Sequence, residues 1–289
     1  MISIILINYN RKQLALNCIY SIHNKSTSSN YEIIVVDNNS TDGSVEAIKA
    51  RYPKVKVIAQ KHNLGFGKAN NIGANASTGE YLFFVNNDTI FTEDIIEPFS
   101  LFLKENPSCG AVGPLLVNAD GTYQHSYGYF PSIINEWRVQ KETKAIKSIP
   151  TNFNPQEVDW VSFAAVMIPR NVFGQISGFD ERYFMYFEDA DVCLRLKEIG
   201  YSTIYYPAHS LVHLGGASWS PKNIDAIRYE YRRSQLLYYS KHISLWQTFL
   251  LRFYLLLKHI LLLIGTNKSE RAKVFSIIKL AVINHAHRS

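Results

Sequence analysis

The sequence predicts an α/β protein with a mostly parallel central sheet, flanking helices and a helical extension at the C-terminus. Short, nearly continuous apolar runs alternate with helical stretches over the first ninety residues, as expected for parallel strands buried on both faces. The 289 residues are 47% hydrophobic and 19% charged, which provides a large core and excludes a disordered chain. The three scattered cysteines indicate neither a disulfide framework nor a zinc knuckle, and they favour a reducing compartment.

Four strands and three helices are predicted in the first ninety residues. The predicted strands are apolar or β-branched runs at 2–8, 31–37, 54–59 and 81–87. The predicted helices lie between them at 11–23, 41–52 and 67–77. No basic region precedes the first apolar run and no small-residue cleavage site follows it, so we expect a buried first strand rather than a signal peptide.

Polar residues follow three of these strands. They form the clusters Asn8-Tyr9-Asn10, Asp37-Asn38-Asn39-Ser40 and Asn86-Asn87-Asp88. Ligands of parallel α/β sheets bind beyond the carboxyl ends of the strands, so we expect these clusters to meet at one site. Helix capping, for which Thr41 or Asp42 is available, explains one residue in a loop but not three polar strand ends.

The next hundred residues add strands and a long polar segment. A helix near 93–105 precedes a strand, a turn and further extended chain in 109–131. Residues 137–157 are polar and weakly periodic, so we expect a loop or lid there. The apolar residues of 158–170 predict another strand, and a helix is expected to follow the acidic cluster at 188–191.

One acid of this cluster is expected to face the core. Asp189 shares a helical face with apolar residues three, four and seven positions later. A carboxylate in that position is sheltered, and the N-terminus of the helix stabilises it. Asp191 is expected on the outward face, where Arg195 is available as an i, i+4 partner. Asp189 is therefore the predicted functional acid.

The positive charge of the chain lies in its C-terminal part. From Pro221 onward there are 12 Lys and Arg against 3 Asp and Glu, a net charge of +9, whereas the preceding residues carry −3. The chain lacks any recognisable nucleic-acid-binding module, so we expect no nucleic acid as a partner. A basic segment beside apolar stretches favours an anionic membrane surface.

The C-terminal part is expected to form amphipathic helices. A helix is predicted over 224–239, an apolar one over 244–265 and a second amphipathic stretch over 271–285. The internal cations Arg252 and Lys258 make a membrane-spanning helix costly, so an interfacial helix is favoured for residues 245–264. Packing on the catalytic domain or in a homodimer is the alternative, and the sequence does not separate these three interpretations.

Five stretches of the sequence, taken in order, carry a resemblance to a known family. They are IILINYNR, EIIVVDNNSTDGSVE, KHNLGFGKANNIGANASTGEYLFFVNND, GFDERYFMYFEDADVCLRLKEIGY and VHLGGAS. The sequence resembles family 2 glycosyltransferases with the GT-A fold, in the rhamnosyltransferase-like branch. The resemblance implies a catalytic domain over 1–220, with a nucleotide-binding half at 1–118 and an acceptor and catalytic half at 119–220. Residues 221–289 would be the helical extension.

The resemblance implies a site for a sugar nucleotide. Tyr9 would stack on the nucleotide base, and Asp37 would accept a hydrogen bond from the N–H of uracil or thymine. A loop and helix start beside the sugar nucleotide would be formed by Asn63, Gly65, Phe66 and Asn70. A glycine turn with tight helix packing explains the same small residues without a ligand.

The resemblance also implies a metal and a catalytic base. The family's Asp-x-Asp motif reads Asn86-Asn87-Asp88 here, so Asp88 would be the carboxylate ligand of Mg²⁺ or Mn²⁺. His213 would join the metal, although a structural histidine explains it equally well. Glu188 and Asp189 match the family's Glu-Asp pair, whose Asp removes the acceptor proton. A single base without a nucleophilic carboxylate implies inversion at the anomeric carbon.

The activity implied is transfer of a sugar from a UDP- or dTDP-sugar to a glycan acceptor in bacterial surface polysaccharide synthesis. The leading donor is dTDP-L-rhamnose, and the expected acceptor is lipid-linked. The enzyme is expected in the cytoplasm, at the inner face of the cell membrane, and a homodimer is also considered. Two rivals are a catalytically inactive nucleotide- or glycan-binding module and a sugar-nucleotide nucleotidyltransferase, whose Gly-rich basic N-terminal signature is missing.

Overall fold

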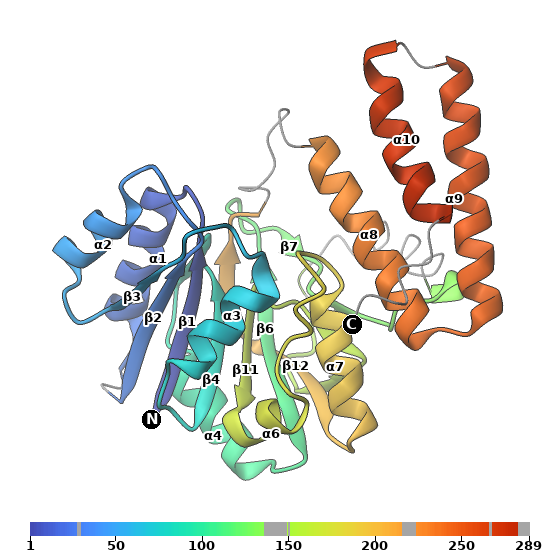
Figure 1. Cartoon of the computed structure of the whole chain (residues 1–289). Coiled ribbons are helices and arrows are strands. Elements are labelled where there is room, and N and C mark those ends of the chain that lie inside the picture. Colours follow the sequence, from blue (N-terminus) through green and yellow to red (C-terminus); the bar gives the residue numbers. More distant parts are fainter. Residues whose placement is uncertain (28–29, 136–148, 150, 216–223, 266–267, 283–289) are drawn as a thin grey trace.

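A computed structural model of the chain describes residues 1–27, 30–135, 149, 151–215, 224–265 and 268–282. A ten-stranded mixed sheet lies at the centre of the molecule, and its main path has the order β3-β2-β1-β4-β11-β6-β12-β5. Helices flank the sheet, and three C-terminal helices stand to one side of it (Figure 1). This architecture confirms the predicted α/β class with flanking helices and a C-terminal helical extension, but the sheet is mixed rather than mostly parallel.

The first half of the sheet is parallel, as predicted. Its elements are β1 (Ile2–Asn8), α1 (Lys12–Lys25), β2 (Tyr31–Asp37), α2 (Ser44–Arg51), β3 (Lys56–Ala59), α3 (Phe66–Asn75) and β4 (Tyr81–Asn86). β1 pairs in parallel with both β2 and β4, which places Asn8 opposite Asp37 and Ile7 opposite Asn86. The polar residues after these strands therefore lie at one edge of the sheet.

The second half of the sheet is mixed. Its elements are β5 (Thr89–Phe91), α4 (Ile96–Glu105), β6 (Cys109–Val117), β7 (Tyr123–Gln124), β8 (Tyr127–Gly128), β9 (Gln156–Val158), β10 (Trp160–Val161), β11 (Ala165–Pro169), α6 (Arg170–Gln175), α7 (Glu188–Glu198) and β12 (Ser202–His213). The strand predicted over 158–170 is wrong in its extent. The chain there forms parts of three strands because β9 pairs with β12, β10 with β8 and β11 with β4.

The segment expected to form a loop or lid at 137–157 lies largely outside the described residues. Its last two residues belong to β9, which is a strand of the main sheet.

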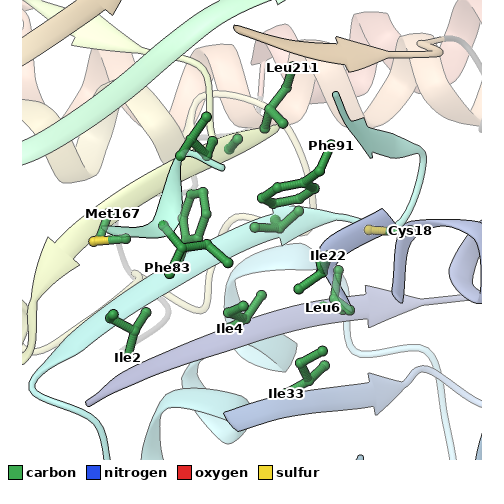
Figure 2. Close-up of a cluster of buried hydrophobic side chains, with 14 of the residues drawn as sticks. Ile2, Ile4, Leu6, Cys18, Ile22, Ile33, Phe83, Phe91, Met167 and Leu211 are labelled. Atoms are coloured by element: carbon green, nitrogen blue, oxygen red, sulfur yellow. The ribbon is translucent and has the colours of Figure 1, made fainter. Parts of the chain in front are cut away.

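The core on one face of the sheet is built by strand residues and α1. Ile4, Leu6 and Phe83 point from β1 and β4 toward Cys18 and Ile22 of α1, and all five are fully or nearly fully buried (Figure 2). The three cysteines are buried and unbonded to each other, as the sequence indicates. This packing fixes the positions of the strand ends that carry the polar clusters.

Three helices follow the sheet, α8 (Ile224–His242), α9 (Leu245–Gly265) and α10 (Lys268–Val282). They share a hydrophobic cluster with the segment before α7 and with α7 itself, including Tyr183, Phe187, Leu236, Tyr238 and Leu255. The extension is thus packed on the catalytic part. The expected boundary at residue 220 lies outside the described residues and stays a prediction.

Three polar side chains of α9, those of Thr248, Arg252 and His259, point into the helical extension, whereas Lys258 is exposed. Thr248 and His259 are buried, and Arg252 donates to the carbonyl oxygen of Ala281 at the end of α10, 3.1 Å away. The opposite face exposes large apolar side chains, namely Leu245, Trp246, Phe249, Leu250, Phe253, Tyr254, Leu257, Ile260, Leu261, Leu262 and Ile264. Leu245–Ile264 is long and apolar enough to cross a membrane by length and composition alone.

Candidate active site

The ends of β1, β2 and β4 are tied together by side-chain hydrogen bonds. The Asn8 amide donates to Asp37 Oδ2 at 2.8 Å, and the Asn87 amide donates to Asn8 Oδ1 at 2.8 Å. Asp37 Oδ1 accepts from the backbone N–H of Ser40 at 2.7 Å. The structure therefore brings the three predicted clusters together, with Asn8 at their centre. The sequence placed Asn8 in a cluster but gave no sign of this central role, which depends on the strand order.

Tyr9 and Asp37 lie in different environments at this edge. The Asp37 side chain is 1% exposed because both of its oxygens are held by the loop bonds, whereas Tyr9 is 48% exposed. Asn10 beside it has a positive φ of 51° and its amide oxygen accepts from Thr41 N at 2.7 Å, which fixes the loop. The loop holds an aromatic ring at the surface next to a fixed carboxylate.

The loop before α3 contacts the segment that leads to α7. Gly65 has a φ of +82°, and a Cβ there would collide with the carbonyl of Phe184, so glycine is required for both reasons. The Phe66 N–H donates to that same carbonyl at 2.8 Å. The Asn63 side chain accepts from Gly65 N at 3.0 Å, and the buried Asn70 amide donates to Phe66 O at 3.2 Å. All four predicted residues of this loop therefore build its shape.

A carboxylate and an imidazole meet after β4. β5 pairs with β12 so that Thr89 lies opposite His213, and His213 Nε2 is 3.2 Å from Asp88 Oδ1. Both side chains are mostly buried. The Asn86 amide lies 3.5 Å from the same ring nitrogen.

This pair fits a divalent cation. Adjacent ligands of an octahedral ion at about 2.1 Å are separated by about 3 Å, close to the distance between the two side chains. No group of three or more His, Cys, Asp and Glu residues forms a metal site among the described residues. The protein would thus supply Asp88 and His213, and the remaining ligands would be oxygen atoms of substrate and water.

The start of α7 is held in a strained conformation by α8. Tyr186 and Phe187 both have left-handed backbones, with φ of 69° and 67°, which costs about 1–3 kcal/mol for each such residue. The Ser234 hydroxyl of α8 donates to the carbonyl of Met185 at 2.7 Å, and the Tyr231 ring lies 5.3–5.6 Å from the Phe187 and Tyr186 rings. Helix α8 therefore fixes the turn that presents Glu188 and Asp189.

The two acids at the N-terminus of α7 are sheltered. Burial raises the pKa of Asp189 above the usual range, although backbone N–H groups, including those of Ala190 and Phe163, oppose the shift. Burial and the nearby Asp189 charge raise the pKa of Glu188 further. Glu188 Oε2 is buried and finds no hydrogen-bond partner in the described part of the chain. A carboxylate with a raised pKa is a stronger base.

A short backbone bridge connects Asp189 to the end of β4, two residues before Asp88. The backbone N–H of Asn86 donates to the carbonyl of Ala164 at 2.9 Å. The preceding residue, Phe163, donates its N–H to Asp189. The sequence gives no sign of this bridge because residues 163 and 164 are apolar.

The expectation that Asp191 faces outward is wrong. Its side chain is fully buried, and the predicted pairing with Arg195 is present at 2.7 Å. Lys241 Nζ at 2.6 Å and His242 Nε2 at 2.7 Å also contact Asp191, from the end of α8. Burial alone would raise the pKa of Asp191, but the His242 hydrogen bond and the cations outweigh it and lower the pKa. The helical wheel failed because the outward face of α7 is covered by α8.

Comparison with known sequences identifies the family. The glycosyl transferase family 2 profile matches residues 3–173. The chain is 28% identical over 273 residues to an N-acetylglucosaminyl-diphospho-decaprenol L-rhamnosyltransferase of Mycobacterium tuberculosis, covering 86% of this chain and 89% of that protein. It is 24% identical over 231 residues to the rhamnosyltransferase WbbL of Escherichia coli, covering 74% of this chain and 83% of that protein.

Solved structures share the fold at low sequence identity. GalNAc-T7 with UDP, GalNAc and Mn²⁺ superposes with a TM-score of 0.63 at 17% identity, covering 96% of this chain and 55% of that chain. The TarS protein of S. aureus gives a TM-score of 0.56 at 16% identity, covering 82% of this chain and 39% of that chain. These structures have the GT-A arrangement predicted above. The chain therefore belongs to glycosyl transferase family 2 and is a rhamnosyltransferase-like member of it.

Proposed function

We propose that this glycosyltransferase inverts the anomeric carbon as it moves a sugar from a UDP- or dTDP-sugar to a lipid-linked glycan. The observation that supports it best is the sheltered Asp189, which a short backbone bridge links to Asn86, two residues before the Asp88 that contacts His213. dTDP-L-rhamnose is the leading donor, because two relatives are named rhamnosyltransferases. The lipid-linked acceptor follows the printed name of the mycobacterial relative.

In the proposed reaction, Asp189 removes the proton of an acceptor hydroxyl while that oxygen attacks the anomeric carbon. The new C–O bond forms as the bond to the diphosphate oxygen breaks, and the leaving nucleoside diphosphate takes that electron pair. General-base catalysis of this kind contributes roughly 10²–10⁴ in rate. Glu188, with its raised pKa, would hold a proton next to Asp189 and limit charge repulsion there.

The nucleotide is proposed to lie over the ends of β1 and β2. Tyr9 would stack on the base, and Asp37, held rigidly by Asn8 and Ser40, would accept from the pyrimidine N–H. Backbone groups of the loop at 63–66 would lie beside the phosphates. A divalent ion on Asp88 and His213 would neutralise charge on the leaving diphosphate.

The apolar face of α9 is proposed to lie on the cytoplasmic surface of the cell membrane. Arg252 donates to the end of α10. Inserting α9 across the bilayer would therefore either carry the charged helix α10 into the membrane or break the Arg252 hydrogen bond. If α9 lies at the membrane surface, this hydrogen bond is kept, and the net charge of +9 of the tail lies near anionic lipid. A homodimer through this face is the competing arrangement.

The donor is tested by offering UDP-, GDP- and dTDP-sugars with Mn²⁺ or Mg²⁺ and measuring nucleoside diphosphate release and transfer to a lipid-linked acceptor. We expect turnover with a dTDP- or UDP-sugar, a requirement for divalent metal and an inverted anomeric product. Asp88→Asn should abolish the metal-stimulated part of the rate, because it removes the one carboxylate of the pair. Nucleotide binding without turnover of any donor would support an inactive binding module instead.

The membrane contact is tested on α9 without truncation. Phe249→Ser and Phe253→Ser together should reduce co-sedimentation with vesicles that contain anionic lipid, since both rings are exposed. Tyr20→Ser on α1 is the control, because that exposed aromatic side chain lies on another element. Binding of the parent should fall as salt rises. If the parent protein does not bind vesicles and is a dimer, and the double variant is a monomer, the apolar face of α9 is a dimer interface.

A further inference from the structure

His213 has a second hydrogen-bond partner on the side away from Asp88. The ring nitrogen Nδ1 of His213 lies 2.7 Å from Oε1 of Gln124, in β7. The Gln124 amide nitrogen donates in turn to Oδ1 of Asn118 at 3.0 Å, which fixes the orientation of the amide. Gly215 leaves room for it, because a Cβ there would come within 3.0 Å of the Gln124 nitrogen. Gln124 is therefore held in place from two sides.

This geometry favours one position for the proton of a neutral His213. An amide oxygen only accepts hydrogen bonds, so the 2.7 Å contact with Gln124 is a hydrogen bond when Nδ1 of His213 carries the proton. In the neutral ring, Nε2 then keeps its lone pair, and it is Nε2 that faces Asp88 at 3.2 Å. A lone pair opposite a carboxylate is repulsive unless a cation lies between the two or the ring gains a second proton.

We infer that Gln124 is a positioning residue that selects the Nδ1-protonated tautomer of His213 and so directs its Nε2 lone pair at a divalent cation shared with Asp88. The inference rests on the proposed function, since it takes Asp88 and His213 as metal ligands. Histidine ligands in proteins usually donate their other N–H to an acceptor in this way, and losing that acceptor costs about 10–100-fold in metal affinity. Gln124 supplies the acceptor from β7, which pairs with β6.

The test measures metal binding without turnover. Mn²⁺ is titrated into the full chain with saturating UDP, and free Mn²⁺ is read by electron paramagnetic resonance. Gln124→Leu removes the acceptor and should weaken Mn²⁺ binding by about 10–100-fold. Gln124→Glu keeps an acceptor oxygen and should bind Mn²⁺ as tightly as the parent or more tightly. Gln175→Leu is the control, because among the described residues the Gln175 amide reaches only Tyr201, at 3.4 Å.

A second measurement separates this inference from the metal site itself. Nitrogen NMR of the metal-free parent should show His213 protonated at Nδ1, and Gln124→Leu should show a mixture of tautomers. Mn²⁺ affinity of Gln124→Leu within twofold of the parent, or an Nε2-protonated ring in the parent, would overturn the role of Gln124. If the parent itself binds no Mn²⁺ while the tautomer is as expected, the proposed metal site fails and the positioning of the ring stands.

Discussion

Two polar clusters in this protein differ in the charge of their side chains: one is mostly neutral and the other is ionic. The strand-end cluster around Asn8 joins neutral amides and a hydroxyl to the single carboxylate of Asp37, and it lies beside the exposed Tyr9. The α7–α8 junction joins the full charges of Lys241 and Arg195 to the fully buried carboxylate of Asp191. The first cluster lies beside an exposed ring, so a ligand can contact it there without separating an ion pair. The second cannot be opened without leaving charges unpaired.

The difference separates the roles of two acids only two residues apart. Asp189 has a raised pKa and lacks a cationic partner in the described chain, so it is suited to take a proton. Asp191 has a lowered pKa and is bound by Arg195, Lys241 and His242, so it is suited to hold α8. Replacing each acid in turn should therefore affect catalysis in one case and folding in the other.

The largest expected effect is on rate. Asp189→Asn keeps the shape of the side chain but removes its basicity, so transfer should fall by about 10²–10⁴ while nucleotide binding and thermal stability are kept. The acid limb of the parent's pH–rate profile should lie above the ordinary aspartate range near 3.9, because the pKa of Asp189 is raised. Near-parental transfer by Asp189→Asn with a defined acceptor would show that another group is the base.

The next effect is on stability. Asp191→Asn leaves Lys241 and Arg195 without their shared carboxylate, and breaking a buried pair in this way typically costs about 3–5 kcal/mol. Urea unfolding measures the loss, with Glu198→Gln on the exposed side of α7 as the control. A loss no larger than that of the control would mean that the junction contributes little to folding.

The same junction should make the free energy of unfolding depend on pH in the acidic range. The pKa of Asp191 is lowered on folding, so its contribution is complete above the unfolded value near 3.9 and is lost as pH falls through the lower folded value. The parent should therefore lose stability with acid more steeply than Asp191→Asn. Parallel acid profiles of the two proteins would contradict the assignment.

A smaller effect is expected at the strand ends. Asp37→Asn removes a charge-assisted hydrogen bond to the base, so affinity for UDP or dTDP should fall by roughly 1.5–3 kcal/mol in calorimetry. Asp42→Asn in the same loop is the matched control, since its contacts are to backbone and hydroxyl groups of Lys12 and Ser44. Unchanged affinity in Asp37→Asn would remove Asp37 from the nucleotide site.

The smallest effect is expected at the turn before α7. Ser234→Ala removes the bond from α8 to the carbonyl of Met185, which should cost about 1 kcal/mol of stability and lower kcat more than it changes KM. Ser240→Ala on the same helix is the control, because its hydroxyl bonds within the helix to Leu237. Equal kcat values for the two variants would mean that α8 does not position the base.

The sequence predicts the strand-end cluster better than the junction, and the reason is physical. The period of the apolar residues identifies β1, β2 and β4, and parallel pairing then brings their ends together without further information. Asp191 is 50 residues from Lys241, and no local pattern shows that α8 covers the outer face of α7. The same applies to Gln124, whose partner His213 is 89 residues away.

The hydrogen bond from Ser234 to the turn before α7 has a consequence for engineering. Exchanging C-terminal helices between related enzymes, in order to redirect them to other surfaces, would also replace the residues that support the turn before Asp189. A chimera joined before α8 would have to carry Lys241, His242 and Ser234 into the new sequence. Joining the chains after His242 instead would keep these contacts, and only the surface-facing α9 and α10 would be exchanged.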